Sequence, residues 1–492
     1  MTINSCFDFI KYGYPKYTVE LTREKMLFCR DIAQKLLEEI GLKVCHEKFR
    51  NAISKHDGVR IDDDRVYLSR QLTDIYFEEY IVRKRAELIS MPASEDKSWS
   101  LSCGGFSIAV LDIETDEARP ATTQDLRDLI RLCNSLDISG NYPCTPQDLP
   151  PLMRTLSCFK ICWEESDKIR PFDYLDSRQV PFLYEMHRVM GKPMSINVNI
   201  CEPFTISEHD IDIVLDWYPK WKEDKSTISW YSVCDYPMLG ITKPITSSGS
   251  ITSYLSQSFG TYILFKLFDQ ELEILPRLSA GMPVDLQTMC WAWGSPRQHL
   301  YDFMNYNLLP LLCGLDVDRY NPGGFITTSS CAVDSRAGME KMATMLIAAM
   351  QGAREFGGAG NLAVDDLFSG IQLALDKEIF EYVKESIEAF SPHEDIMSID
   401  GIYEVMRDVA LGGDEFYSHM DTATKVRNIL SVSKRRPSEK LRSWMMHKKN
   451  LNDRLREECL ERIRTQKPFV LAKEKKRELD KIYKTAEKLL FE

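Results

Sequence analysis

The feature that most constrains this chain is a regular alternation of short apolar segments with segments of helical periodicity, from residue 105 to residue 360. The segments expected as strands are Phe106–Leu111, Ile138–Tyr142, Met194–Ile200, Thr227–Val233, Leu272–Leu275, Leu286–Trp293, Phe325–Thr328 and a glycine-rich stretch that ends near Gly360. The helices expected between them cover residues 122–136, 177–190, 207–221, 249–269 and 334–352. Such alternation requires a parallel sheet. About eight repeats favour a closed (β/α)8 barrel of the TIM type over an open doubly wound sheet.

The regions that flank this alternation have a different character. Residues 1–104 are expected to form an α/β cap, residues 105–430 the barrel, and residues 431–492 a charged helical extension. The stretch 92–105 is expected to be a loop that separates the cap from the rest of the chain. Apolar residues in the extension keep helical spacing, which predicts helices packed on the outside of the barrel. The alternative is a dimerisation or partner surface, so a homo-oligomer is also considered.

Composition excludes several classes of partner. The chain has 492 residues, a net charge of -12 and a pI near 5.4. Surfaces that bind nucleic acid or anionic membranes need a basic excess, so neither partner is expected. No stretch approaches the roughly 18 uninterrupted apolar residues of a membrane span, and the N-terminus lacks the apolar region of a signal peptide. We therefore expect a cytoplasmic protein.

The sequence has no motif for an intrinsic metal or a bound nucleotide. The 14 cysteines include only one close pair, Cys158 and Cys162, and the 8 histidines form no HExxH motif. Neither a GxxxxGK[ST] nor a GxGxxG motif is present, and the glycines of residues 352–362 have the wrong spacing. A dinucleotide-dependent oxidoreductase is therefore not expected.

Candidate site residues lie in four stretches near the expected strand ends, where barrel enzymes carry their reactive groups. In TISWYSV, residues 227–233, Trp230 and Tyr231 must point to opposite faces of a strand. Trp291 and Trp293 share one face if their segment is extended. Such a pair is suited to an aromatic cage around a quaternary ammonium group, although packing in the core is the alternative.

The other two stretches offer a possible anion site and a histidine. In NPGGFITTSSCAVDSRAGMEKM, a helix capped by Asp334 or Ser335, with Arg336 beside it, could hold a carboxylate. The alternative is an ordinary helix cap with a solvated arginine. In GGDEFYSHMDT, residues 412–422, the lone histidine is more often a packing residue than a catalyst. No nucleophilic triad is recognised, and Cys331 has no motif that marks it as reactive.

Seven motifs resemble, in their order, those of the trimethylamine methyltransferase family, which comprises corrinoid-dependent methylamine and quaternary-amine methyltransferases. The resemblance extends from the N-terminal helix to about residue 430. The motifs are ARPATTQDLRDLIRLCNSL, PCTPQDLPP, KPITSSGS, GMPVDLQT with GSPRQ, GGFITTSSCAVDSRAGMEKM, LALDKEIFEYVK and GGDEFYSHMDT.

This resemblance implies a (β/α)8 barrel that moves a methyl group from an amine to cob(I)alamin, giving methylcobalamin, on a separate corrinoid protein. Family members that use trimethylamine carry pyrrolysine in the stretch corresponding to about Thr328–Ser335, where this chain has only standard residues. That difference points to the non-pyrrolysine branch, which resembles glycine betaine methyltransferase. A quaternary amine leaves as a neutral amine and so needs no covalent activation.

The resemblance also gives the candidate residues their expected roles. Tyr231, Trp291, Trp293 and Phe325 are the candidates for the cation cage, Ser330 and Arg336 for the substrate carboxylate, and His419 for a catalytic or orienting role. The His419 stretch follows the family's Gly-Gly-x-x-Phe-x-x-His pattern. Two rival functions stay open: a corrinoid-dependent demethylase of a methoxy or other methyl donor, and a non-catalytic betaine-binding protein.

Overall fold

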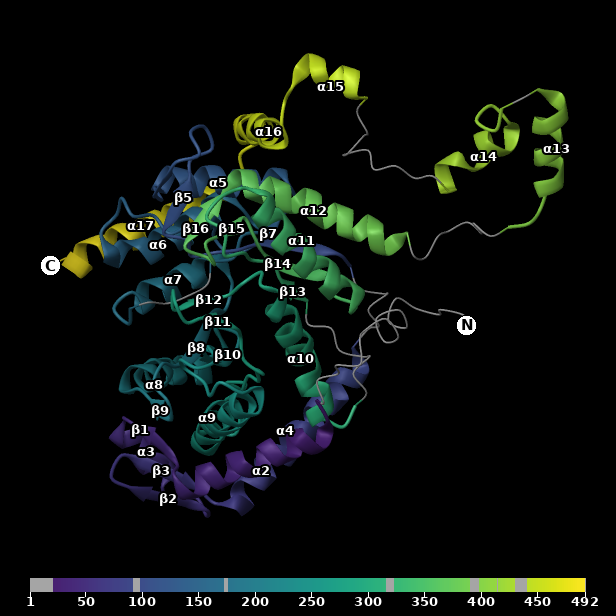
Figure 1. Cartoon of the computed structure of the whole chain (residues 1–492). Coiled ribbons are helices and arrows are strands. Elements are labelled where there is room, and N and C mark those ends of the chain that lie inside the picture. Colours follow the sequence, from purple (N-terminus) through teal and green to yellow (C-terminus); the bar gives the residue numbers. More distant parts are fainter. Residues whose placement is uncertain are drawn as a thin grey trace.

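The computed structural model describes residues 21–91, 98–171, 176–315, 323–389, 398–413, 415–429 and 440–491 (Figure 1). The fold is mixed α/β, and two of its ladders consist of parallel strands alone. The first ladder has the order β13 (Gly324–Phe325), β14 (Glu355–Ala359), β4 (Ser100–Cys103) and β7 (Ser139–Gly140). All its pairs are parallel, and Gly140 continues it through a parallel bridge to Ile169.

The second ladder consists of β8 (Met194–Ile200) and β10 (Ile228–Asp235), which pair in parallel. A parallel bridge joins Ser232 of β10 to Leu275. Together the two ladders contain eight parallel segments in sequence order. Among the described residues, no strand pairing joins one ladder to the other.

A helix follows each of the eight segments. These helices are α5 (Thr123–Ser135), α6 (Pro151–Glu165), α7 (Val180–Met190), α8 (Glu208–Glu223), α9 (Ser247–Phe268), α10 (Pro296–Leu312), α11 (Ser335–Met350) and α12 (Gly370–Glu388). The five helices expected from periodicity are all confirmed. Their starts were readable because local caps set them: Thr122 and Asp125 form a capping box on α5, and Asp334 caps α11.

One expected loop and two of the expected strands differ from the structure. The segment Ser100–Cys103, expected as part of a loop, is β4, whose alternate positions are serines and therefore lack an apolar run. Only the end of Phe106–Leu111 forms a strand, β5 (Ala109–Leu111), in a separate sheet with β6 (Ala118–Pro120), β15 (Asn361–Leu362) and β16 (Leu367–Ser369). The region Leu286–Trp293 is a short antiparallel hairpin, β11 (Val284–Asp285) with β12 (Cys290–Trp291), rather than a barrel strand.

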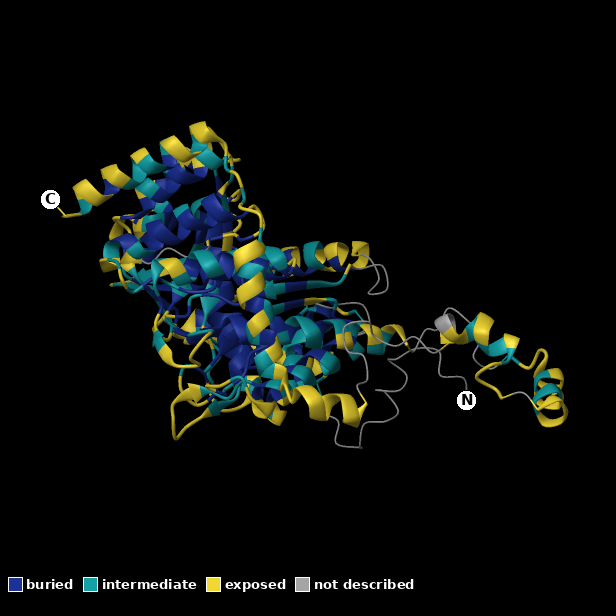
Figure 2. Ribbon diagram, turned by 90° about the horizontal axis from the view of Figure 1, so that it is seen from above, coloured by how far each residue is buried: buried dark blue, intermediate teal, exposed yellow. Residues whose placement is uncertain are grey.

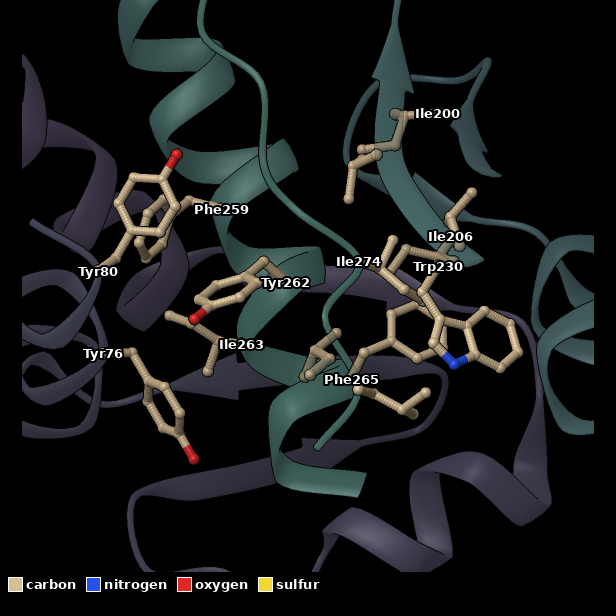
Figure 3. Close-up of a cluster of buried hydrophobic side chains, with 14 of the residues drawn as sticks. Tyr76, Tyr80, Ile200, Ile206, Trp230, Phe259, Tyr262, Ile263, Phe265 and Ile274 are labelled. Atoms are coloured by element: carbon tan, nitrogen blue, oxygen red, sulfur yellow. The ribbon is translucent and has the colours of Figure 1, made fainter. Parts of the chain in front are cut away.

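The N-terminal region packs mainly on the helices α9 and α10. It contains α2 (Arg23–Glu39), β1 (Leu42–Val44), α3 (Glu47–Ile53), β2 (Val59–Asp62), β3 (Arg65–Leu68) and α4 (Arg70–Ser90). Its sheet is completed by β9 (Thr205–Ile206), parallel to β1. The helix α9 is buried along nearly its whole length, and Lys266 is its one charged residue. Figure 3 shows its aromatic side chains Phe259, Tyr262 and Phe265. Phe77 of α4 stacks on Phe259 with ring centroids 3.9 Å apart.

Two C-terminal helices cover the first ladder's outer helices, as the sequence predicts. In α16 (Leu451–Thr465), Leu455 and Cys459 are buried in the core shared with α5 and α12. In α17 (Lys473–Phe491), the hydroxyl of Tyr483 lies 2.8 Å from that of Ser157 on α6. The helix α15 (Leu441–His447) has no buried residue. The proposed domain boundaries stay predictions.

Helices α13 (Ile402–Gly412) and α14 (Met420–Ile429) lie apart from the two ladders in both views (Figures 1 and 2). No residue of α13 is buried. Within the described ranges, no helix is both long enough and apolar enough to cross a membrane.

Candidate active site

Three of the four predicted cage residues form one aromatic cluster, Trp291, Trp293 and Phe325. The two indole rings stack with centroids 5.3 Å apart and an interplanar angle of 22°. The ring of Phe325 lies 5.3 Å from that of Trp293 at 58°. Both tryptophans are half-buried, and Phe325 is 43% exposed. Flat aromatic faces that are still reachable from solvent are what a cation–π site requires.

The hairpin β11–β12 brings the tryptophans to this position from the second ladder. Just beyond the end of β10, the backbone N–H of Met282 donates to the carbonyl of Pro237 at 2.7 Å, and a bridge joins Met282 to Met238. Val284 then pairs with Trp291. The hairpin therefore connects the carboxyl end of β10 to β13, the strand that carries Phe325.

A hydroxyl-rich loop after β13 holds the hairpin in place. The Ser329 hydroxyl donates to the carbonyl of Trp293 at 2.9 Å. The same loop is fixed from the other side, where the N–H groups of Ala363 and Val364 donate to the carbonyls of Ser330 and Thr328 at 2.7 and 2.8 Å. Backbone hydrogen bonds thus join the loops after β13 and β14, and the Ser329 hydroxyl ties them to the aromatic cluster.

Glu340 on α11 is the central anchor of this arrangement. Its carboxylate accepts hydrogen bonds from the Thr328 hydroxyl, from the Ser329 N–H at 3.3 Å and from Arg336 Nε at 2.8 Å. Gly294 packs directly against it: a Cβ there would lie 2.6 Å from the Cβ of Glu340, and the residue has φ +74°. Only glycine fits this turn, which directs the chain from Trp293 into α10.

The two residues predicted to bind a carboxylate have other partners. Arg336 forms an ion pair with Glu340, and this hydrogen bond raises the pKa of the guanidinium. Ser330 is 5% exposed, and its hydroxyl lies 3.2 Å from the carbonyl of Ala332 and 3.2 Å from the carboxylate of Asp334, the α11 cap. Both residues therefore shape the start of α11, and their contact with substrate stays a prediction.

The remaining two candidates lie away from the aromatic cluster's core. Tyr231 belongs to the second ladder, and the guanidinium of Arg277 lies 5.7 Å from its ring centroid. His419 precedes α14, and its Nδ1 accepts a hydrogen bond from the Asp421 N–H at 3.1 Å. Because α14 lies apart from the ladders, the structure does not bring His419 to Trp291 and Trp293 (Figure 1).

Sequence reasoning missed several residues that the structure brings to the strand ends, namely Ser329, Glu340, Arg277 and Asn361. Asn361 follows β14, is 1% exposed, and neither atom of its carboxamide has a hydrogen-bond partner in the described part of the chain. The i,i+4 spacing of Arg336 and Glu340 was the one signal available for Glu340. No cluster of three or more metal-ligating side chains occurs in the described ranges.

A separate cavity of about 220 Å³ lies between α2, α9 and α10. Met26, Ile251 and Met304 contribute to its wall. It contains none of the predicted site residues, so the aromatic cluster, rather than this cavity, is the candidate active site.

Comparison with known proteins agrees with the motif order. The model of the family described as trimethylamine methyltransferase matches residues 2–488. The chain is 36% identical over 416 residues to trimethylamine methyltransferase MttB of Methanosarcina barkeri strain Fusaro, covering 75% of this chain and 76% of the relative. It is 22% identical over 338 residues to the MttB of Desulfitobacterium hafniense, covering 65% of this chain and 64% of that relative, which is less than two thirds. The resemblance is confirmed, and the chain belongs to the trimethylamine methyltransferase family.

Proposed function

We propose that this protein transfers a methyl group from a quaternary amine of the betaine type to the Co(I) of a corrinoid carried by a separate protein. The observation that carries the proposal is the aromatic cluster of Trp291, Trp293 and Phe325 at the strand ends. A quaternary ammonium has no N–H to donate, so it is recognised by the negative faces of aromatic rings. Membership of the methyltransferase family supports the reaction type.

We also propose that the two ladders are parts of one (β/α)8 barrel. Eight parallel segments, each followed by a helix, support this architecture. In such a barrel the loops after the strands form the active site. Trp291 and Trp293 lie in the connection that follows the Leu275 segment, Phe325 ends β13, and Glu340 lies on α11, the helix that follows β13.

The chemistry assigns a limited task to the protein. The C–N bond of the substrate breaks with its electron pair going to nitrogen, and a neutral tertiary amine leaves. The electron pair of Co(I) forms the new bond to the methyl carbon. No proton moves, so the site needs no general acid or base. Its residues must hold the methyl group in line with the leaving nitrogen and exclude water.

The choice of a quaternary amine over trimethylamine rests on the residues after β13. The sequence there is Thr-Ser-Ser-Cys-Ala-Val-Asp-Ser, residues 328–335, with no unusual residue. Trimethylamine would need activation before a neutral amine could leave, whereas a betaine carries that activation in its own positive charge. The relatives are named for trimethylamine, so this amine belongs in any test.

The decisive experiment is an anaerobic assay with chemically reduced cob(I)alamin, following methylcobalamin by its absorbance. The donors are glycine betaine, proline betaine, carnitine, choline, trimethylamine and an aryl methyl ether. Methylation by a quaternary amine supports the proposal. Transfer from the ether would favour a demethylase. Binding of betaine without any transfer, even with the cognate corrinoid protein, would favour a binding protein.

Two variants test the cage within the same assay. W291A and W293A should each raise the KM for the active donor about 3- to 30-fold, because one cation–π contact contributes about 0.5–2 kcal/mol. The matched control is W444A, since Trp444 is a 45% exposed tryptophan on α15. Unchanged kinetics in both W291A and W293A would remove the cage from the proposal.

A further inference from the structure

We propose that the second ladder carries a carboxylate-binding subsite in which Arg277 is the cationic group and a zwitterionic amine is the ligand. This inference rests on the proposed function and deepens it, because it separates betaines from quaternary amines without a carboxylate. The argument begins with an irregularity in β10.

A β-bulge in β10 displays two neighbouring side chains at one position. Trp230 pairs with Ile196 and Val233 with Val198, so Tyr231 and Ser232 together oppose the single residue Asn197. Bulges of this kind re-aim side chains and are frequent next to active sites. Trp230 points into the apolar core on one face of the ladder, as Figure 3 shows. Tyr231, which is 50% exposed, lies on the opposite face.

Arg277 lies on the bulge and is held in a defined orientation. Its Nε donates to the Ser232 hydroxyl at 3.0 Å, and its guanidinium carbon is 5.7 Å from the centroid of the Tyr231 ring. Its backbone N–H donates to the Ser258 hydroxyl at 2.9 Å. A guanidinium fixed by one nitrogen over an aromatic ring has lost much of its rotational freedom before a ligand arrives.

The two terminal nitrogens of Arg277 are available to a ligand. Among the described residues, no carboxylate forms an ion pair with Arg277, and no hydrogen bond uses these nitrogens. Arg336, the arginine favoured by the sequence, already pairs with Glu340. A substrate carboxylate would have to compete with Glu340 at Arg336 but meets no competitor at Arg277. The planar fork of terminal N–H groups matches a carboxylate.

Asn197 adds a second polar group to the same face. It stands opposite the bulge, between the buried residues Ile196 and Val198, and its Oδ1 is buried with no hydrogen-bond partner in the described ranges. Rotation of the carboxamide would present its N–H2 group to an anion. A buried amide oxygen without a partner calls for a ligand or a water at this place.

The test compares two ligands that share the same cationic group, of which only one carries a carboxylate. Glycine betaine and choline both carry a trimethylammonium group, but choline ends in a hydroxyl. Isothermal titration calorimetry should show that wild type binds glycine betaine more tightly than choline. In R277Q the Kd for glycine betaine should rise about 10- to 100-fold, as expected for a lost charge-assisted hydrogen bond, while the Kd for choline stays within twofold. R277K should fall between the two.

A matched control is R60Q, because the guanidinium of Arg60 lies 3.5 Å from the centroid of the Tyr67 ring on the N-terminal sheet, far along the chain from the bulge. It should leave both affinities unchanged. If R277Q retained the preference of wild type for glycine betaine over choline, the subsite would be refuted. Methyl transfer is measured separately. Active transfer, together with an unchanged preference of R277Q for glycine betaine over choline, would overturn this inference alone. Binding that depends on Arg277 but is not followed by methyl transfer would overturn only the proposed function.

Discussion

The Glu340 anchor gives the sharpest prediction about how the site is built. In E340A, the Thr328 hydroxyl loses its acceptor inside a fully buried environment, and the Ser329 N–H loses its partner at a half-buried position. An unsatisfied buried donor costs about 1–3 kcal/mol, and the half-exposed one costs less because water can reach it. The i,i+4 pair with Arg336, whose guanidinium is exposed, contributes only about 0.3–0.5 kcal/mol. We therefore expect E340A to lower the free energy of unfolding by about 2–4 kcal/mol.

E340Q separates the acceptor from the charge. The amide keeps one oxygen that can accept from Thr328, so the loss should be near 1 kcal/mol. Urea unfolding followed by fluorescence measures both variants, with E185A as the control because Glu185 forms an exposed pair with Arg188 on α7. E340A should also weaken betaine binding about tenfold, since Gly294, which follows Trp293, would lose the side chain it packs against, and Ser329, which holds Trp293, would lose its backbone partner. Wild-type stability together with wild-type affinity in E340A would refute the reasoning.

Three further predictions concern buried groups outside the cage. K341M should destabilise the fold by about 3–5 kcal/mol, because Lys341 and Asp376 are both fully buried and paired at 2.6 Å. In urea unfolding, the double variant K341M/D376L should be more stable than K341M, because it leaves no unpaired buried charge. Equal stabilities of the two variants would contradict this explanation. G294A should lower the free energy of unfolding by about 2–4 kcal/mol, because Gly294 has a left-handed φ and an added Cβ would overlap Glu340. G338A should not destabilise the fold, because Gly338 lies inside α11 with open space around its Cβ position. Similar effects of the two substitutions would exclude this explanation. Burial lowers the pKa of His187 to about 4, below its ordinary value of 6.5. The free energy of unfolding should therefore be unaffected by this histidine above pH 6.5 and should fall by about 3 kcal/mol as the pH drops from 6.5 to 4. NMR titration of the imidazole measures this pKa, and a value near 6.5 would refute the prediction.

The sequence predicted those structural features that are determined by residues close together in the chain. Helix α5 was found because its periodicity and its cap lie within one short segment. The alignment of Trp291 with Trp293 follows from their two-residue spacing, although they belong to a hairpin and its following turn rather than to a barrel strand. Motif order gave the family, which the comparisons confirm.

Features that depend on contacts between residues far apart in the chain could not be predicted. Gly294 and Glu340 are far apart in the sequence, and nothing local marks the glutamate as the support of the tryptophan turn. The choice between Arg277 and Arg336 depends on which of them lies beside a carboxylate. Strand β4 was missed because its serines face away from the core, so it lacks the apolar run that identifies a buried strand.

The two parts of the proposed site have opposite electrostatic character and belong to different ladders. The aromatic cluster, completed by Phe325 of the first ladder, suits the ammonium group, and Arg277 on the second ladder suits the carboxylate. A zwitterion that touches both would place its methyl groups relative to two fixed points, whereas choline would have one. Met282 donates to Pro237 just before the hairpin β11–β12, and Ser329 donates to Trp293 just after it, so the hairpin connects the two ladders that carry these groups. Betaine specificity and methyl-group alignment would then depend on the same hairpin, so loosening it through E340A should reduce the turnover of glycine betaine more than that of choline.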